Sequence, residues 1–332
     1  MAQKGIGRLF SVGIAKETAR GTAETSATYW IPFSDASIDE KFENVTQDEA
    51  YGIIEDSVGQ FRVKNWAEGT LKVPLTDQSL PLLLYSIFGH NADATHSGET
   101  TVYDHTLTVG ETAQHQSLTL FIHDPLSGQD YSHANGVIHK LELTAELKKF
   151  IDLSLSVKAF KGATQTSFTP SIVAENRFLP QHLTFKYATT VSGLSSATAI
   201  ALKSIKLSID ESIEDDDVLG QDSPLDFLNK EFKITGQLEA IFENNTDFKQ
   251  VALADPNVAQ ALSIDIKNTD VTIGTAANPE VAITLDKVYF TEYSRPIKVK
   301  DLVYQTVKFV AAYSVTDSEM AKIVVTNTVA SY

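Results

Sequence analysis

The stretch LELTAELKKFIDLSLSVKA, residues 141–159, alternates apolar and polar side chains over most of its length. A period of two places alternate residues on opposite faces of a β-strand, so one face can enter a core while the other meets water. The alternation is interrupted only around Lys148 and Lys149. The pattern therefore predicts two neighbouring antiparallel strands, over 141–147 and 151–159.

Shorter runs on either side of this stretch predict further strands. One segment differs, because its apolar residues between Leu80 and Phe88 recur at the spacing of one helix face. Asp77 or Ser79 is expected to cap this helix, and Gly89 is expected to end it. The sequence therefore predicts a mainly β fold with a short helix packed on it. The additional strands are expected over 71–75, 118–122, 205–209, 232–242, 281–290 and 302–310.

The tetrapeptide Ser-Ile-Asp-Glu occurs twice, at 37–40 and at 208–211. Each copy is followed by an acidic, turn-rich stretch, by a strand that contains a glycine, and by a Thr-Asp pair that opens an apolar helical segment. The same order in both halves favours an internal duplication. We expect two tandem β-sandwich or half-barrel domains, each with a short flanking helix: residues 1–165, which include an N-terminal arm, and residues 166–332. The matched features are 43–56 and 214–226, Gly69 and Gly236, and 76–77 and 246–247.

Composition excludes several classes of protein. The 332 residues are 42% hydrophobic, so the chain can bury a core, and they carry 27 basic and 43 acidic side chains for a net charge of −16. This charge argues against a protein that grips nucleic-acid phosphates. The absence of cysteine removes thiol chemistry. The longest apolar stretch, 80–88, is far shorter than the roughly 20 residues that cross a bilayer, so we expect a soluble chain made in the cytoplasm, without a secretion signal or membrane insertion.

Motifs of catalysis and cofactor binding are missing. Gly5-Ile6-Gly7 continues to Phe10 where a dinucleotide fingerprint needs glycine, and no Gly-x-Ser-x-Gly, His-Glu-x-x-His or phosphate-loop pattern occurs. Seven of the eight histidines lie between 90 and 139, but their spacing repeats no metal-ligand pattern, and we expect solvated loop histidines. The sequence thus predicts no enzyme and no cofactor, with an enzyme that uses dispersed carboxylates as an alternative.

An acidic run offers a second alternative. Asp215, Asp217 and Asp226 occupy positions one, three and twelve of a calcium-loop template, but Leu219 breaks position five and no flanking helices are evident. The simpler interpretation is a solvated hairpin tip. The run is also suited to an electronegative surface in an assembly.

Two segments near the N-terminus carry a resemblance to a known family. One reads GIAKET at 13–18, followed by Gly21-Thr22 and YWIPF at 29–33; the other reads WAEGTLKVPL at 66–75 and leads to the helix that ends Ile87-Phe88-Gly89. This order resembles the tail tube proteins of long-tailed bacteriophages. The resemblance is clearest over residues 10–90, and its motifs are structural.

The resemblance implies a non-enzymatic virion protein. In that family a β-sandwich with a flanking helix joins its neighbours into a ring, and the rings stack into a hollow tube that conducts the genome. It implies assembly in the host cytoplasm, location in the phage tail, and contacts with tape measure, tail tip and tail terminator proteins. DNA would pass through the tube transiently and without sequence specificity.

The duplication refines this expectation. If each half is a tube domain, three chains can close a ring with pseudo-sixfold symmetry, with a ring of six chains as the alternative. An acidic lumen would repel phosphates, with candidates Glu142, Glu146 and Asp152. The N-terminal arm, 1–28, is expected to contact the next ring through Lys4, Arg8 and Phe10. Candidate ring-stacking loops carry Glu43, Asp48, Glu49, Glu55, Glu214, Asp215, Asp216 and Asp217.

Two other classes share this profile. A capsid decoration protein or a tail terminator would also be β-rich and non-enzymatic, but it would form capsid-bound or single-ring oligomers. A carbohydrate-binding or calcium-binding β-sandwich module is favoured only if the segment 215–226 binds metal.

Overall fold

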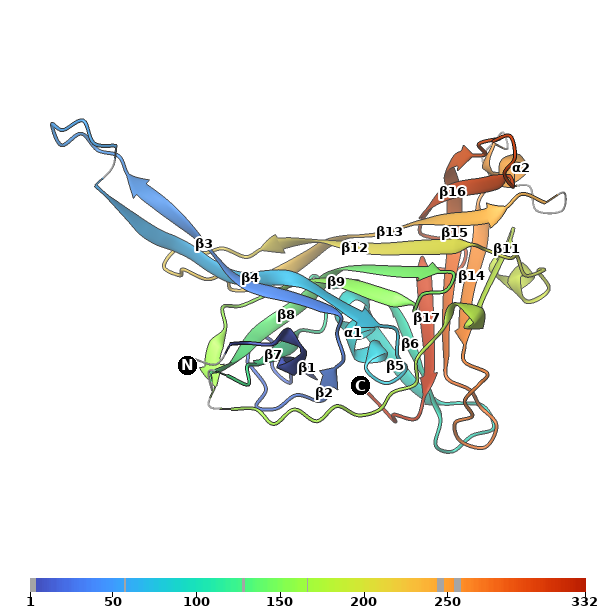
Figure 1. Ribbon diagram of the computed structural model, residues 1–332, viewed down its shortest axis with the longest axis horizontal. Coiled ribbons are helices and arrows are strands. Elements are labelled where there is room, and N and C mark those ends of the chain that lie inside the picture. The colour runs from blue at the N-terminus through green and yellow to red at the C-terminus, as the bar shows by residue number, and fades with distance from the viewer. Residues whose placement is uncertain (1–3, 57, 127–128, 166, 244–247, 254–257) are drawn as a thin grey trace.

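The fold consists of long antiparallel strands with two short α-helices (Figure 1). The computed structural model describes residues 4–56, 58–126, 129–165, 167–243, 248–253 and 258–332. The helices are α1 (Leu80–Phe88) and α2 (Phe248–Ala252), and single 3-10 turns lie at Gly7–Leu9, Pro180–His182 and Val191–Ser195. The strands are β1 (Ser11–Lys16), β2 (Tyr29–Ile31), β3 (Asp35–Gln47), β4 (Gly59–Pro74), β5 (Gly89–Thr95), β6 (Tyr103–Val109), β7 (Leu118–His123), β8 (Asp130–Glu146), β9 (Asp152–Ala159), β10 (Ala163–Gln165), β11 (Leu183–Ala188), β12 (Ser204–Asp215), β13 (Phe227–Ile241), β14 (Gln260–Lys267), β15 (Glu280–Ser294), β16 (Tyr304–Ala311) and β17 (Ala321–Asn327).

Three runs of neighbouring strands make up the sheet network. The longest has the order β3-β4-β9-β8-β12-β13-β16-β15. A second run is β2-β1-β7-β8-β10, and a third is β11-β14-β15-β17-β6-β5. The strands β8 and β15 each take part in two runs, because different ends of each strand pair with different neighbours. These two strands therefore connect the three runs: β8 joins the longest run to the second, and β15 joins it to the third.

The period-two prediction over 141–159 is confirmed. In β9 the apolar residues from Leu153 to Ala159 are buried at every second position, and in β8 Leu141, Leu143 and Ala145 are buried in the same way. The two strands pair in register, with Leu141 opposite Leu155 and Leu143 opposite Leu153. The mainly β fold class is likewise confirmed.

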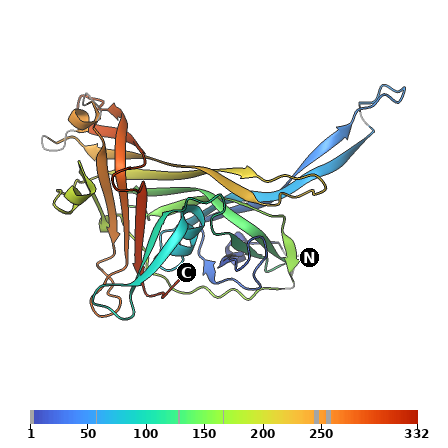
Figure 2. The same cartoon turned by 180° about the vertical axis from the view of Figure 1, so that it is seen from behind.

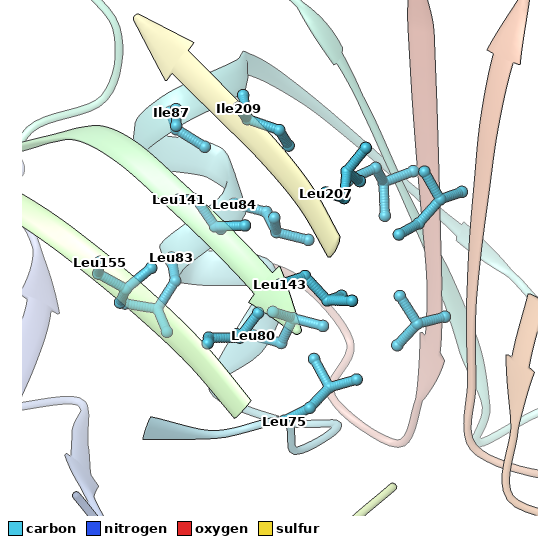
Figure 3. Close-up of a cluster of buried hydrophobic side chains, with 14 of the residues drawn as sticks. Leu75, Leu80, Leu83, Leu84, Ile87, Leu141, Leu143, Leu155, Leu207 and Ile209 are labelled. Atoms are coloured by element: carbon cyan, nitrogen blue, oxygen red, sulfur yellow. The ribbon is translucent and has the colours of Figure 1, made fainter. Parts of the chain in front are cut away.

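Helix α1 lies against the apolar face of the longest run. Its bounds match the prediction, and its leucines face Leu141 and Leu143 of β8, Leu155 of β9 and Leu207 of β12 (Figure 3). Gly89 ends the helix with φ of 80°, a left-handed conformation that glycine adopts without a steric penalty. The expected side-chain cap is wrong: Ser79 stands at the N-cap position, but its hydroxyl donates to Glu175 Oε2 at 2.9 Å.

The acidic segment 43–60, for which the sequence predicts a hairpin of loop-like composition, is strand only at its two ends. Residues up to Gln47 belong to β3, and β4 begins at Gly59, so the segment is the end of a hairpin that extends beyond the rest of the molecule (Figures 1 and 2). We call residues 42–63 the arm; it is distinct from the N-terminal arm, which keeps its full name. In the second half, β12 likewise continues to Asp215 and β13 begins at Phe227. The Thr-Asp pair expected at 246–247 lies outside the described residues.

The two halves show the same order of strand pairings. The hairpin β3–β4 pairs with β9, which pairs with β8; the hairpin β12–β13 pairs with β16, which pairs with β15. A register shift lies between Ile138 and Lys140 in β8–β9 and between Phe290 and Glu292 in β15–β16. Helix α1 contacts β8, and α2 contacts β15. A bulge is a local irregularity of one strand pair. Because it occurs at the same place in the corresponding pairs of both halves, Ile138 of the first half aligns with Phe290 of the second.

Gly69 allows β3 to lie close against β4. A Cβ at this position would stand 1.6 Å from the carbonyl oxygen of Ser37, a backbone atom that cannot turn away. We expect Gly69→Ala to lower the free energy of unfolding by about 1–3 kcal/mol or more, the range of overpacking. Gly59→Ala on the same strand is the control, because its nearest atom is a flexible Gln47 side chain at 3.9 Å. Equal urea midpoints for the two variants would contradict the close approach.

Candidate assembly surfaces

The two halves of the chain meet edge to edge between β8 and β12. The pairing is antiparallel and runs from Lys140 opposite Asp210 to Glu146 opposite Ser204. On one face it buries Leu141, Leu143 and Ala145 against the isoleucines and leucine of β12. This junction, which we call the internal seam, shows how one sheet edge of this chain receives another.

The opposite face of the internal seam carries ion pairs. Glu142 accepts from Lys206 at 2.9 Å and from Lys140 at 3.1 Å, with its side chain about a quarter exposed. The hydrogen bond from Lys206 lowers the pKa of Glu142, and Lys140 lowers it further. The two lysines therefore largely neutralise this carboxylate.

Carboxylates of the second hairpin are held by basic residues of the first half. Asp215 bonds Lys158 at 2.6 Å and Lys64 at 2.7 Å, and Lys64 also bonds Asp217 at 2.5 Å. Asp226 bonds Arg20 at 2.8 Å. Burial raises the pKa of Asp215, but the two lysines outweigh it and hold the pKa below its usual value.

The three aspartates of the calcium-loop template have basic or amide partners within the chain. Asp215 and Asp217 share a lysine, and Asp226 takes an arginine together with the Asn135 amide at 2.9 Å. In the part of the chain that the structure describes, no three His, Cys, Asp or Glu side chains are grouped to hold a metal ion. The three aspartates thus tie the second hairpin to β4, β9 and the segment after β1.

The expectation of solvated histidines is wrong for several positions. His105, His115 and His133 are buried, and each has hydrogen-bond partners. His115 Nδ1 lies 2.8 Å from Glu211 Oε1 and 3.0 Å from the Ile87 carbonyl, while Nε2 lies 2.9 Å from the Gly110 carbonyl. A backbone carbonyl can only accept, and each ring nitrogen faces one, so both ring nitrogens donate. The ring is an imidazolium, and Glu211 is its counter-ion.

Burial alone would lower the pKa of His115, but the hydrogen bond and charge of Glu211, with the two carbonyls, outweigh it and raise the pKa. Burial also raises the pKa of Glu211. A neutral Glu211 would leave the doubly donating ring without a counter-ion, and we therefore assign the charged pair. Because Glu211 belongs to β12 and His115 follows β6, this pair also joins the two halves.

The longest run of strands ends in two free edges. Among the described residues, no strand pairs with the outer edge of β3, and none pairs with residues 289–292 of β15 on the side away from β16. An unpaired edge presents backbone donors and acceptors that another strand can complete. The edges of β3 and β15 are therefore candidate surfaces for a second chain.

The three candidate lumen carboxylates lie on one face of this run, opposite α1. Glu142 and Glu146 lie on β8, and Asp152 begins β9 opposite Thr144. Lysines are interleaved with the acids on this polar face, and Glu146 bonds Lys149 at 2.5 Å. The charged residues on this face include Asp35, Asp39, Glu68, Glu142, Glu146, Asp152, Asp210, Glu231, Glu239 and Glu292, with Lys41, Lys72, Lys140, Lys158, Lys206, Lys233 and Lys308.

The candidate stacking residues occupy the hairpin ends rather than separate loops. Glu43 lies in β3, and Asp48, Glu49 and Glu55 lie at the tip of the arm. Glu214 and Asp215 belong to β12, while Asp216 and Asp217 follow it. Both hairpins extend toward the same side of the molecule (Figure 1).

The N-terminal arm is shorter than the expected 1–28. Residues 11–16 form β1, which lies between β2 and β7, and Arg20 binds Asp226. Lys4 and Arg8 precede β1 and are exposed, whereas Phe10 is half-buried and borders a cavity of about 530 Å³ with Phe33 and Ile172. Residues 1–3 lie outside the described residues. Of the described N-terminal residues, only 4–10 precede the sheets.

Residues 7–311 match the family of phage tail tube proteins. No curated protein matches the chain. No helix in the described ranges has the length and apolar character to cross a membrane.

Proposed function

The chain belongs to the phage tail tube protein family, and we propose that it polymerises into rings that stack into the hollow tube through which the genome passes. It is a structural protein of the virion tail. The observation that carries the finer proposal is the internal seam, because it joins two similarly paired sheets edge to edge within one chain.

We propose that three chains close one ring. The recurrence of strand order, of the bulge and of the glycine opposite β3 and β12 supports a duplicated tube domain, with one copy in each half. Six such domains arise from three chains, whereas a ring of six chains would contain twelve. Closure of the sheet would also complete every free edge of the longest run.

The internal seam supplies the register of the junction between chains. The bulge aligns Lys140 with Glu292. The glycines Gly69 and Gly236 face Ile38 and Leu207, and this structural alignment places Asp210 with Lys41, two residues beyond the Asp39 that the repeated tetrapeptide would give. Repeating the seam places Glu292 of β15 opposite Lys41 of the next chain. Lys140 faces Asp210 in the internal seam, so the proposed junction has the same opposite-charge pair with the signs exchanged.

The polar face is suited to the lumen. Helix α1 and the remaining sheets cover the apolar face, so a barrel closed from the longest run must turn its polar face inward to leave a channel. Glu142, Glu146 and Asp152 then line the lumen, as their sequence positions suggested. Lys140 and Lys206 point to the same side, but both are held by Glu142, which weakens their attraction for phosphates. The lumen would also hold the tape measure protein, and the ends of the stack would meet tail tip and terminator proteins.

The ring is tested by cross-linking Lys41→Cys with Glu292→Cys in one chain. Opposed residues of antiparallel strands have Cα atoms about 4.5–5.5 Å apart, which a disulfide can span. The chain contains no cysteine, so oxidation reports only the designed pair. We expect covalent species on non-reducing gels that end at a closed trimer.

Lys41→Cys with Lys308→Cys is the matched control. Lys308 lies on β16, one strand further from the edge, opposite Glu292, and a second strand spacing of about 4.8 Å puts it beyond disulfide reach. A ladder that ends at six chains would support the hexamer instead. Absence of cross-links in assembled protein would refute the β15–β3 junction.

A further inference from the structure

The two ends of the longest run of strands differ in charge. At the end formed by the hairpins, the segment 43–60 contains five acidic residues and no basic one. The second hairpin reads Glu-Asp-Asp-Asp at 214–217, but three of these four acids bond lysines of the same chain, so the first hairpin supplies most of the negative charge. At the other end lie two turns, 147–150 between β8 and β9 and 295–303 between β15 and β16. The first turn contains Lys148 and Lys149, of which Lys149 bonds Glu146, and the second contains Arg295, Lys298 and Lys300 with one acidic residue, Asp301. These basic groups stand out in a chain of net charge −16.

Both ends also expose apolar side chains. In the arm, Ile54 is fully exposed, and Tyr51, Ile53, Val58 and Phe61 are more than half exposed. In the turns, Leu147 and Phe150 are about half exposed, and Val299 is 90% exposed. Exposed apolar residues gathered at a projecting tip or turn are typical of interaction sites rather than of a solvated surface.

The two basic turns correspond to each other. The bulge that aligns Ile138 with Phe290 also aligns Leu147 with Val299 and Phe150 with Leu302. Both turns thus carry lysines beside the same two apolar positions. The first turn borders a cavity of about 440 Å³ that Leu179 and Pro180 complete. The end of the longest run that carries the turns therefore has two similar surfaces, each with apolar and basic side chains.

We propose that the turns 147–150 and 295–302 receive the acidic, apolar hairpin tips of a second copy of this chain. The tips join β3 to β4 and β12 to β13, whereas the turns join β8 to β9 and β15 to β16, at the opposite end of the same run of strands (Figure 1). The tips and turns of one copy therefore cannot contact each other. Contact between different surfaces of two copies leaves free tips at one end of the stack and free turns at the other, so the stack stays open and can grow. Opposite charges set the direction of stacking, because tip against tip or turn against turn is repulsive.

This inference names the partner surface for the stacking step and rests on the proposed tube. It concerns contacts between rings, whereas the β15–β3 junction concerns contacts within a ring. The two can therefore fail separately.

Cysteine pairs test the contact directly. Ile54→Cys is combined with Lys148→Cys in one variant and with Lys300→Cys in another, each in the full chain. We expect oxidation of the concentrated protein to give an open ladder that continues beyond three chains for at least one of the pairs. Ile54→Cys with Val315→Cys is the control, because Val315 is 80% exposed but lies outside both turns.

Charge reversal gives the second measurement. Lys148, Lys149, Lys298 and Lys300 are all changed to Glu, and we expect sedimentable polymer to fall about tenfold or more, with the ring cross-link of Lys41→Cys with Glu292→Cys unchanged. Adding Asp48→Lys, Glu49→Lys and Glu55→Lys to that chain is expected to restore polymer. Reversed lysines without effect on polymer, or ladders no stronger than in the Val315 control, would overturn the inference. Loss of the ring cross-link alone would count against the proposed ring and not against this contact.

Discussion

Replacing Glu211 by alanine is expected to lower the free energy of unfolding by about 3–5 kcal/mol, because it leaves the buried imidazolium of His115 without a counter-ion. His115 and Glu211 are both almost fully buried, and the ring donates to the carboxylate at 2.8 Å. The substitution also removes a charged contact between the two halves of the chain. Urea unfolding at pH 6 measures the loss.

Glu214→Ala is the matched control for this substitution. Glu214 lies on the same strand, but its side chain is about three-fifths exposed and bonds an equally exposed Lys230. Surface pairs of this kind contribute at most about 1 kcal/mol. Similar losses for the two variants would show that the His115–Glu211 pair is not the buried ion pair described above.

The same pair makes stability depend on pH. The folded protein holds the pKa of His115 above its usual 6.5. A group with a raised pKa stabilises the fold fully below its unfolded pKa, and this contribution is lost as the pH rises through the folded pKa. We therefore expect stability to decline as the pH is raised above about 6.5, and this decline to disappear in Glu211→Gln. An equal decline in that variant would assign the pH dependence to other groups.

Shortening the arm is expected to abolish tubes while rings still form. Residues 48–58 are replaced by Asn-Gly, a two-residue turn that joins Gln47 to Gly59 at the last pair of β3 and β4. Residues 48–56 and 58 are exposed, so the free energy of unfolding should change little. Electron microscopy and sedimentation of the concentrated protein measure the tubes, and the Lys41→Cys with Glu292→Cys cross-link measures the rings.

A second variant separates the length of the arm from its chemistry. Changing Tyr51, Ile53 and Ile54 to Ser keeps the hairpin and its charge but removes the exposed apolar side chains. We expect it to reduce tube formation less than the deletion does. Tubes at wild-type yield in the shortened protein would disprove any role of the arm in stacking.

Local pattern was sufficient for the elements that are half-buried. The alternation in β9 and in the second part of β8 could be predicted because each residue's burial repeats with the period of its own backbone. Helix α1 is buried at every position except Tyr85, so its prediction depended on the apolar spacing and on Gly89 rather than on a period of burial. The N-terminal motifs indicated the family, and residues 7–311 match it.

Other elements had no such signal. The outer part of β4 extends beyond the core, so neither of its faces is buried and no period of burial appears in it. The histidines 105, 115 and 133 lie in polar sequence, yet distant segments bury them. Their surroundings are not a local property of the chain.

The sequence by itself determined the β-rich class, the bounds of α1, the acidic charge and the repeated order of features in the two halves. Only the tertiary structure decided that β8 joins β12, that Lys64, Lys158 and Arg20 hold the aspartates of the second hairpin, and that β3 and β15 remain as free edges. The physical reason is distance along the chain. A strand's period depends on its own residues, whereas its partner and its charged neighbours are set by packing between segments that lie some 60 to 200 residues apart.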